Sequence, residues 1–167
     1  MNIKNLHIPI ILVSIIVSVI SSFGSFGDVI GFLTFLKPES TFNGYIGFIS
    51  FGETFFVQNE WWRLVTPMLI HFSFAHLAFN CLWIYILGSK IELISGRMKF
   101  LLLVLLTSIG ANLTQYFFTE SALFGGLSGV VYGLLGYCMI IEFEQKSEIY
   151  GLPPAIYMFM IVWMFLG

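Results

Sequence analysis

Residues 124–133 read FGGLSGVVYG, which places a serine among glycines in a strongly apolar chain. The apolar run 127–141 that contains Ser128 has only about 15 residues, whereas a full membrane crossing by a helix needs about 20. The preceding stretch, TESALFGG, favours turns and must enter the membrane if this helix begins deep. Irregular backbone at that depth is tolerated only where it is buried in protein or lines a water-filled cavity. The pattern therefore predicts that Ser128 begins a short helix at the floor of a cavity.

The composition places the chain among membrane proteins. Hydrophobic residues make up 58% of its 167 residues and charged residues only 10%, whereas a soluble domain has about 25% charged residues. A net charge of -2 without a basic patch argues against a nucleic-acid partner. The sequence has no CxxC, His/Cys cluster or GxGxxG motif, so we expect no metal and no cofactor. Cys81 and Cys138 lie in apolar runs and are expected to be free thiols.

Five apolar runs predict an all-α polytopic membrane protein that folds as one domain. The expected spans are about 8–23, 64–87, 100–118, 127–141 and 152–166. The first run also fits a signal peptide, because Lys4 precedes a short apolar core, but four further spans favour a retained helix. The aromatic-rich connection 24–61 fits a segment in the membrane interface, anchored by Trp61 and Trp62. It equally fits a loop packed on the helix ends, and the two interpretations are compatible.

Charge placement predicts the orientation of these spans. With the N-terminus in the cytoplasm, most basic residues fall on the cytoplasmic side, as the positive-inside rule requires. The cytoplasmic set is Lys4, Lys90, Arg97, Lys99 and Lys146, and the outer set is Lys37 and Arg63.

Polar side chains interrupt the second span, where residues 71–80 read HFSFAHLAFN. His76 and Asn80 are four residues apart and therefore lie on one helical face. They could join helices through hydrogen bonds. Alternatively, they could be hydrogen-bond donors that face a nucleophile, and together with Ser128 and its backbone N–H they would then form an oxyanion hole.

The glycines around Ser128 also have two interpretations. Gly125, Gly126 and Gly129 would let the backbone approach a reacting carbonyl closely. The four-residue spacing of Gly125, Gly129 and Gly133 is equally typical of close helix packing. The order Gly126-Leu127-Ser128-Gly129 does not match the Gly-x-Ser-x-Gly elbow of soluble hydrolases.

Taken together, these residues resemble the rhomboid family of intramembrane serine proteases, in its minimal six-helix bacterial form. The resemblance rests on four motifs: Trp61–Arg63 (WWR), His76-x-x-x-Asn80, Glu92-x-x-x-Gly96, and Gly125–Gly129 (GGLSG) followed by Tyr132. It implies a rhomboid-like helical bundle that cleaves transmembrane protein substrates in the lipid bilayer without metal or cofactor. It also implies a bacterial inner-membrane protein whose active site opens to the periplasmic side.

The resemblance assigns roles to individual residues. Ser128 would be the nucleophile, and the oxyanion would be stabilised by His76, Asn80 and the backbone N–H of Ser128, with that of Leu127 as a further candidate. Tyr132 would pack against the catalytic histidine. Substrate contact or packing is implied for Gly126, Leu127 and Gly129, and a structural role for Trp62, Arg63 and Glu92. His71 matches no catalytic position and is expected to be a buried polar contact.

One element of the family pattern is missing from these residues. The family's general base is a histidine on the sixth helix, whereas the histidines here are His7, His71 and His76. The final residues, MFMIVWMFLG, are apolar to the last position, where a chain terminus would place a carboxylate at the edge of the hydrocarbon. We therefore expect the chain to continue beyond Gly167 with a sixth helix that carries the base.

Two other functions compete with the protease. A catalytically inactive rhomboid-like protein that binds transmembrane helices would share the polar cavity but need no base. A small transporter or channel would use His76, Asn80 and Ser128 to line a solute path. The transporter predicts an internal repeat and charges within the membrane, and the sequence contains neither.

Overall fold

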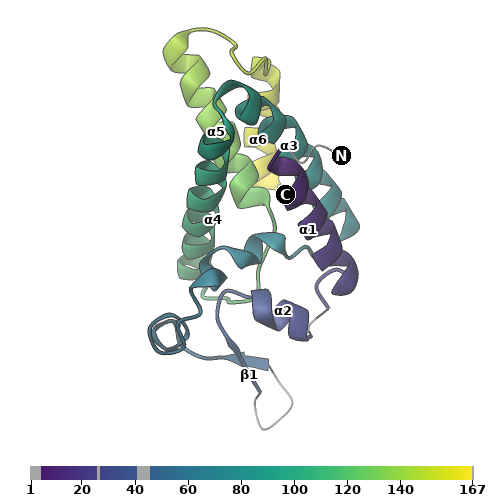
Figure 1. Cartoon of the computed structure of the whole chain (residues 1–167), viewed down its shortest axis with the longest axis vertical. Helices are drawn as coiled ribbons and strands as arrows, with labels where there is room; N and C mark the ends of the chain where they lie inside the picture. Colours follow the sequence, from purple (N-terminus) through teal and green to yellow (C-terminus); the bar gives the residue numbers. More distant parts are fainter. Residues whose placement is uncertain (1–4, 26, 41–45, 167) are drawn as a thin grey trace.

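The computed structural model describes residues 5–25, 27–40 and 46–166. The long helices are α1 (His7–Ile20), α3 (Phe74–Ile94), α4 (Arg97–Thr119), α5 (Ser128–Gln145) and α6 (Pro154–Leu166). Between α1 and α3 lie α2 (Asp28–Leu33), β1 (Pro38–Ser40), β2 (Ile46–Phe48), the π-helical turn η1 (Glu53–Val57) and the 3₁₀ helices η2 (Trp61–Leu64) and η3 (Thr66–Leu69). The expected five-span bundle therefore corresponds to α1, α3, α4, α5 and α6 (Figure 1).

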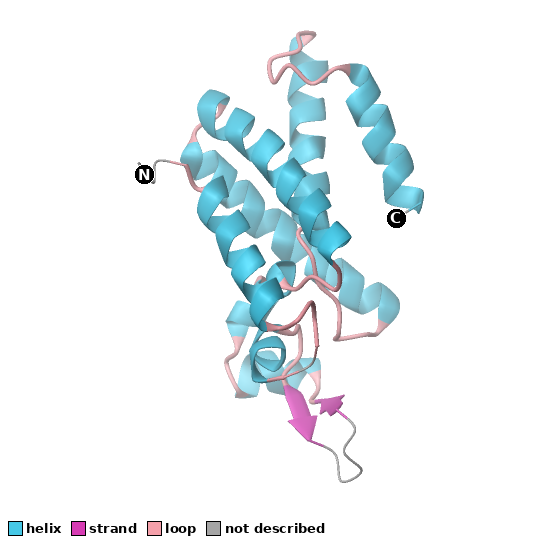
Figure 2. Cartoon of the chain, turned by 90° about the vertical axis from the view of Figure 1, so that its right-hand side faces the viewer, coloured by secondary structure: helices cyan, strands magenta, loops and turns pink. Residues whose placement is uncertain are grey.

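The helices pack around a shared apolar core. Helix α3 packs against α1, α4 and α5, while α4 and α5 pack on each other and α6 packs on α5 (Figure 2). Fully buried side chains of this core include Ile84, Leu87, Phe100, Leu134 and Met160. Helices α3 and α4 are long and apolar enough to cross a membrane, and α1 and α6 are apolar but shorter.

Helix α3 begins later than the expected span 64–87, and this boundary needs correction. Ser73 has an extended backbone, and its hydroxyl oxygen accepts the backbone N–H of His76 at 3.2 Å. This is an N-cap, which fixes the helix start at Phe74. Residues 64–73 instead form the end of η2, η3 with Pro67 in its first turn, and a short turn. The apolar run 64–73 is therefore not part of the membrane-spanning helix, and within it only Pro67, Ile70 and His71 are buried.

The C-terminal end of α3 extends past Lys90 and Glu92, and both of these charged residues have hydrogen-bond partners. Lys90 Nζ donates to the Tyr150 carbonyl at 2.7 Å. The buried Glu92 carboxylate accepts the backbone N–H groups of Leu6 at 3.0 Å and His7 at 2.7 Å, and contacts His7 Nδ1 at 2.9 Å. N–H groups in the first turn of a helix lack internal partners and favour a negative charge. Glu92 thus joins the start of α1 to the end of α3.

Two glycines let α5 approach α4 closely. A Cβ added at Gly129 would collide with the Ala111 side chain, and one added at Gly133 would collide with Thr107. This is the small-residue packing considered for these positions. Gly125 precedes the helix and packs elsewhere, against Ile70.

Helix α5 also continues beyond the expected end of its span at residue 141. Glu142 lies past this expected end and is buried. Its carboxylate accepts the Tyr150 backbone N–H at 2.7 Å and the Tyr157 hydroxyl at 2.6 Å. These contacts fix the connection between α5 and α6.

The connection between α1 and α3 is folded and packs on the helix ends. β1 and β2 form an antiparallel pair with Pro38 opposite Phe48. Phe35 lies at the centre of an aromatic cluster with Phe55, and with Tyr116 from α4 and Phe124 from the connection before α5. These contacts support the interpretation of 24–61 as a loop packed on helix ends. Its position in the membrane interface stays a prediction.

Arg63 joins two turns of this loop from a buried position. Its Nη1 donates to the carbonyl oxygens of Gly31 and Thr34, each at 2.8 Å, and its Nε donates to Glu60 Oε2 at 2.6 Å. Lys37 Nζ approaches Glu60 Oε1 at 3.0 Å. Burial works against a charge on Glu60, but the hydrogen bonds from Arg63 and Lys37 outweigh it and hold its pKa below the ordinary value.

Trp62 adds a second link within the loop. Its indole N–H donates to the Phe32 carbonyl at 3.2 Å, and its ring stacks on the Phe32 ring with centroids 5.3 Å apart. Both tryptophans of the WWR motif are exposed, whereas Arg63 is buried.

Candidate active site

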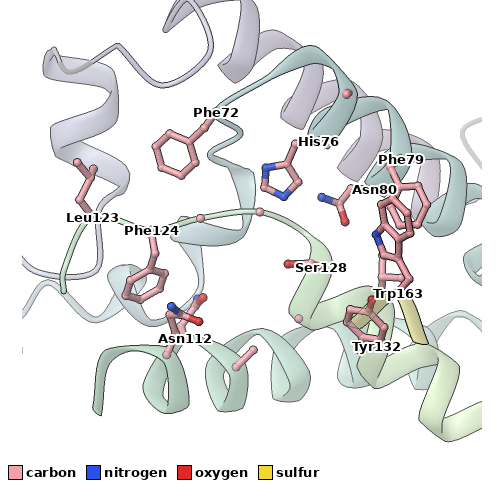
Figure 3. Close-up of a pocket in the computed structure, with 17 residues that line it drawn as sticks. Phe72, His76, Phe79, Asn80, Asn112, Leu123, Phe124, Ser128, Tyr132 and Trp163 are labelled. Carbon is pink, nitrogen blue, oxygen red and sulfur yellow. The ribbon is translucent and has the colours of Figure 1, made fainter. Parts of the chain in front are cut away.

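A cavity of about 970 Å³ opens among α3, α4, α6 and the start of α5. Ser128, His76, Asn80 and Tyr132 all line it (Figure 3). The structure thus brings together at one cavity the side chains that the sequence assigned to the reaction.

Ser128 is the first residue of α5. The connection from α4 rises into the middle of the bundle before α5 begins (Figure 1). The N–H of Val131 donates to the Leu127 carbonyl at 2.8 Å, which leaves the N–H groups of Ser128, Gly129 and Val130 without an intrahelical acceptor. Unpaired N–H groups and the helix dipole make this helix start favourable for negative charge.

Gly126 brings this backbone beside His76. Its N–H donates to the Pro67 carbonyl at 3.1 Å, and its φ of +123° is a conformation that other residues rarely adopt. A Cβ at this position would lie 2.6 Å from His76 Nε2. Glycine therefore suits this position, because it adopts this φ without strain and leaves room for the His76 imidazole.

We expect Gly126→Ala to destabilise the protein by about 1–3 kcal/mol, because the strained φ adds to the collision with His76. Thermal unfolding in detergent measures the effect. Gly136→Ala in α5 is the matched control, since a Cβ there meets nothing within 4 Å and alanine favours a helix. Equal unfolding temperatures for the two variants would contradict the prediction.

His76 and Asn80 face the cavity from the first turns of α3 (Figure 3). Asn80 is 2% exposed, and its Nδ2 has no hydrogen-bond partner among residues 5–25, 27–40 and 46–166. This Nδ2 lies 3.7 Å from the position a Cβ on Gly126 would take. A buried amide without an acceptor costs free energy, so Asn80 offers an unused donor beside the nucleophile segment.

His71 is a buried polar contact, as the sequence analysis expected, but the sequence did not reveal its partners. Its Nε2 accepts the Leu127 backbone N–H at 3.4 Å, and its Nδ1 lies 3.2 Å from the Leu69 carbonyl. The Leu127 N–H, a candidate oxyanion donor, thus already has an acceptor. The only sequence signal was a second histidine in HFSFAH, because the partner lies 56 residues away.

Comparison with known proteins identifies the family of this chain. Residues 58–167, which contain η2, η3, α3, α4, α5 and α6, match the Rhomboid domain family. The chain belongs to the rhomboid family. Its fold is therefore the helical membrane bundle expected from the sequence.

Curated relatives of this rhomboid chain are bacterial. It is 42% identical over 107 residues to a rhomboid protease GlpG homolog of Cronobacter sakazakii, a match that covers 64% of this chain and 38% of the relative. It is 37% identical over 106 residues to a rhomboid protease GlpG of Serratia proteamaculans, with 64% and 38% covered. The chain thus spans well under half the length of these relatives.

Aromatic side chains also line the rhomboid cavity. Tyr132 lines it one turn after Ser128, yet its ring forms no aromatic pair with a histidine in the part of the chain that the structure describes. Its expected packing against the catalytic histidine stays a prediction. Trp163 of α6 stacks on Phe79 of α3, with ring centroids 5.3 Å apart, where α6 meets α3 (Figure 3).

Neither cysteine contributes a reactive group to the cavity. Cys81 and Cys138 are free thiols, as expected, and neither is among the residues that line it. Within the described ranges, no group of three or more His, Cys, Asp or Glu side chains could hold a metal ion.

Proposed function

We propose that the protein is an intramembrane serine endopeptidase that hydrolyses peptide bonds in or near transmembrane segments of membrane proteins. One observation carries the proposal: the buried amide of Asn80 has no acceptor among the described residues and lines the same cavity as Ser128. A peptide carbonyl that becomes an oxyanion there would supply the missing acceptor. The names of the GlpG relatives, rhomboid proteases, agree with this chemistry.

In the proposed reaction, Ser128 Oγ attacks the carbonyl carbon of the scissile peptide bond and passes its proton to a general base. Asn80 Nδ2, an N–H of His76 and the backbone N–H of Ser128 donate hydrogen bonds to the oxyanion that forms. The C–N bond then breaks, the amine leaves with the proton, and an acyl-enzyme remains. Water hydrolyses this ester and restores Ser128.

The general base is proposed to come from outside these 167 residues. His7 is held by Glu92, which lies about 24 Å along α3 from His76 at 1.5 Å per residue. His71 Nε2 is engaged by the Leu127 N–H, and His76 is assigned to the oxyanion. A serine hydroxyl without a base is a poor nucleophile, so the mechanism needs a further residue.

The cellular setting follows from the same proposal. The protein would lie in a bacterial inner membrane with its N-terminus in the cytoplasm, and its cavity would open to the periplasmic side. Its partners would be transmembrane protein substrates and the lipid bilayer, with no metal, cofactor or nucleic acid.

A catalytically inactive rhomboid-like protein that binds transmembrane helices is the second candidate. The observation that favours it is that no hydrogen bond to the Ser128 hydroxyl occurs in the described part of the chain. Such a protein would use the cavity to hold a helix and would not need an activated serine.

Fluorophosphonate labelling of the full-length, detergent-solubilised protein separates the two candidates. We expect one covalent adduct, which peptide mass spectrometry assigns to Ser128, and no adduct after heat denaturation. A folded full-length protein that gains no adduct at Ser128 would refute the protease and support the helix-binding protein.

A further inference from the structure

We propose that His71 is a positioning residue that holds the nucleophile segment in place through the Leu127 backbone N–H. The inference rests on the proposed protease function, because it concerns the placement of Ser128. His71 acts on Ser128 only indirectly, through Leu127, the residue just before it.

Residues 67–71 hydrogen-bond to and pack against residues 125–127. The Gly126 N–H donates to the Pro67 carbonyl at 3.1 Å, and Gly125 lies against Ile70 so closely that a Cβ would come within 2.6 Å of the Ile70 Cβ. The Leu127 N–H completes the set by donating to His71 Nε2 at 3.4 Å. His71 is the residue of this stretch that accepts its hydrogen bond through a side chain, and the N–H that it binds belongs to the residue just before Ser128.

The two contacts of the His71 ring define its protonation. Nε2 accepts a hydrogen bond and so carries no proton, which leaves the proton on Nδ1, 3.2 Å from the Leu69 carbonyl. The ring is fully buried and lies between these two backbone groups. A neutral imidazole protonated at Nδ1 is therefore the form that supports the segment.

His71 also lies against the proposed oxyanion donor. The His71 and His76 rings meet edge to face with centroids 4.9 Å apart. One short stretch of chain thus provides both the contact that holds Leu127 and the imidazole that faces Gly126. We infer that His71 sets the distance between the nucleophile and the oxyanion donors.

Three substitutions in the full-length protein separate hydrogen bonding from packing. His71→Phe keeps the ring shape and removes both hydrogen bonds. His71→Gln extends an amide to the Nε2 position and can accept from Leu127, whereas the shorter His71→Asn reaches only the Nδ1 position. Turnover of a membrane-spanning reporter substrate is measured in liposomes well below each variant's unfolding temperature.

We expect His71→Phe and His71→Asn to lower kcat about tenfold with KM within about twofold, and His71→Gln to restore kcat to within about threefold. Equal kcat for the Phe and Gln variants would overturn the inference, because packing alone would then explain His71. An increase in KM at unchanged kcat would overturn it as well.

A spectroscopic measurement keeps the inference testable if the protein has no protease activity. The ¹⁵N spectrum of full-length protein labelled at histidine should show His71 protonated at Nδ1 and hydrogen-bonded at Nε2, and His71→Gln identifies the signal by its loss. A His71 ring protonated at Nε2 would refute the positioning contact. Absence of turnover with the expected spectrum would refute the proposed protease and leave the contact standing.

Discussion

Ser128→Ala is expected to lower cleavage of a membrane-spanning substrate by the full-length protein about 10⁴-fold or more, down to background. Proposed acyl transfer begins at the Ser128 hydroxyl, and alanine removes this nucleophile while keeping the helix start. Cleavage in liposomes, followed by electrophoresis of the products, measures the loss. Covalent fluorophosphonate labelling should disappear in the same variant.

The unfolding temperature of Ser128→Ala should equal that of the unchanged protein, although the activity is lost. No hydrogen bond to the Ser128 hydroxyl occurs among the described residues, so its removal leaves no buried group newly unpaired there. Ser147→Ala, at an exposed position just beyond the far end of α5, is the matched serine control and should retain full cleavage. Cleavage that survives Ser128→Ala would refute Ser128 as the nucleophile.

Asn80→Leu is expected to lower kcat about 10²–10³-fold, the usual loss when one oxyanion donor is removed. Leucine has a similar volume but no donor. Because the Nδ2 of Asn80 is buried without a partner in the described structure, its removal should keep or raise the unfolding temperature. A loss of activity combined with unchanged or greater stability identifies a side chain retained for chemistry.

Asn112→Leu provides the matched asparagine control. Asn112 lines the same cavity, but its Nδ2 donates to the Leu64 carbonyl at 2.8 Å. Its replacement should lower the unfolding temperature, because the Leu64 carbonyl loses a partner. If Asn80→Leu destabilises the protein as much as Asn112→Leu and leaves kcat unchanged, Asn80 is a packing residue.

The helices were predictable where a local signal defined them. Helices α1, α4 and α6 begin and end within a few residues of their apolar runs, because the length of such a run is a property of consecutive residues. Helix α3 was not predictable in this way. Residues 64–72 are mostly apolar but precede the Ser73 cap. Glu92 lies past the expected end of the span, and its partners are at the start of α1.

The candidate site was likewise predictable only in part. The sequence indicated Ser128, His76 and Asn80 because each is a polar side chain in an apolar setting, where polarity is costly and marks function. It predicted His71 only as a buried polar contact and not its partner, because that partner is a backbone N–H with no sequence signature.

The sequence by itself determined the membrane class, the helical bundle and the motifs of the rhomboid family, since these depend on composition and on short spacings along the chain. Only the tertiary structure decided that Asn80 lacks an acceptor among the described residues, that Leu127 is bound by His71, and that Arg63 joins the loop carbonyls. Whether a buried polar atom is paired depends on which distant segment packs against it, and such contacts between distant segments form only when the whole bundle folds.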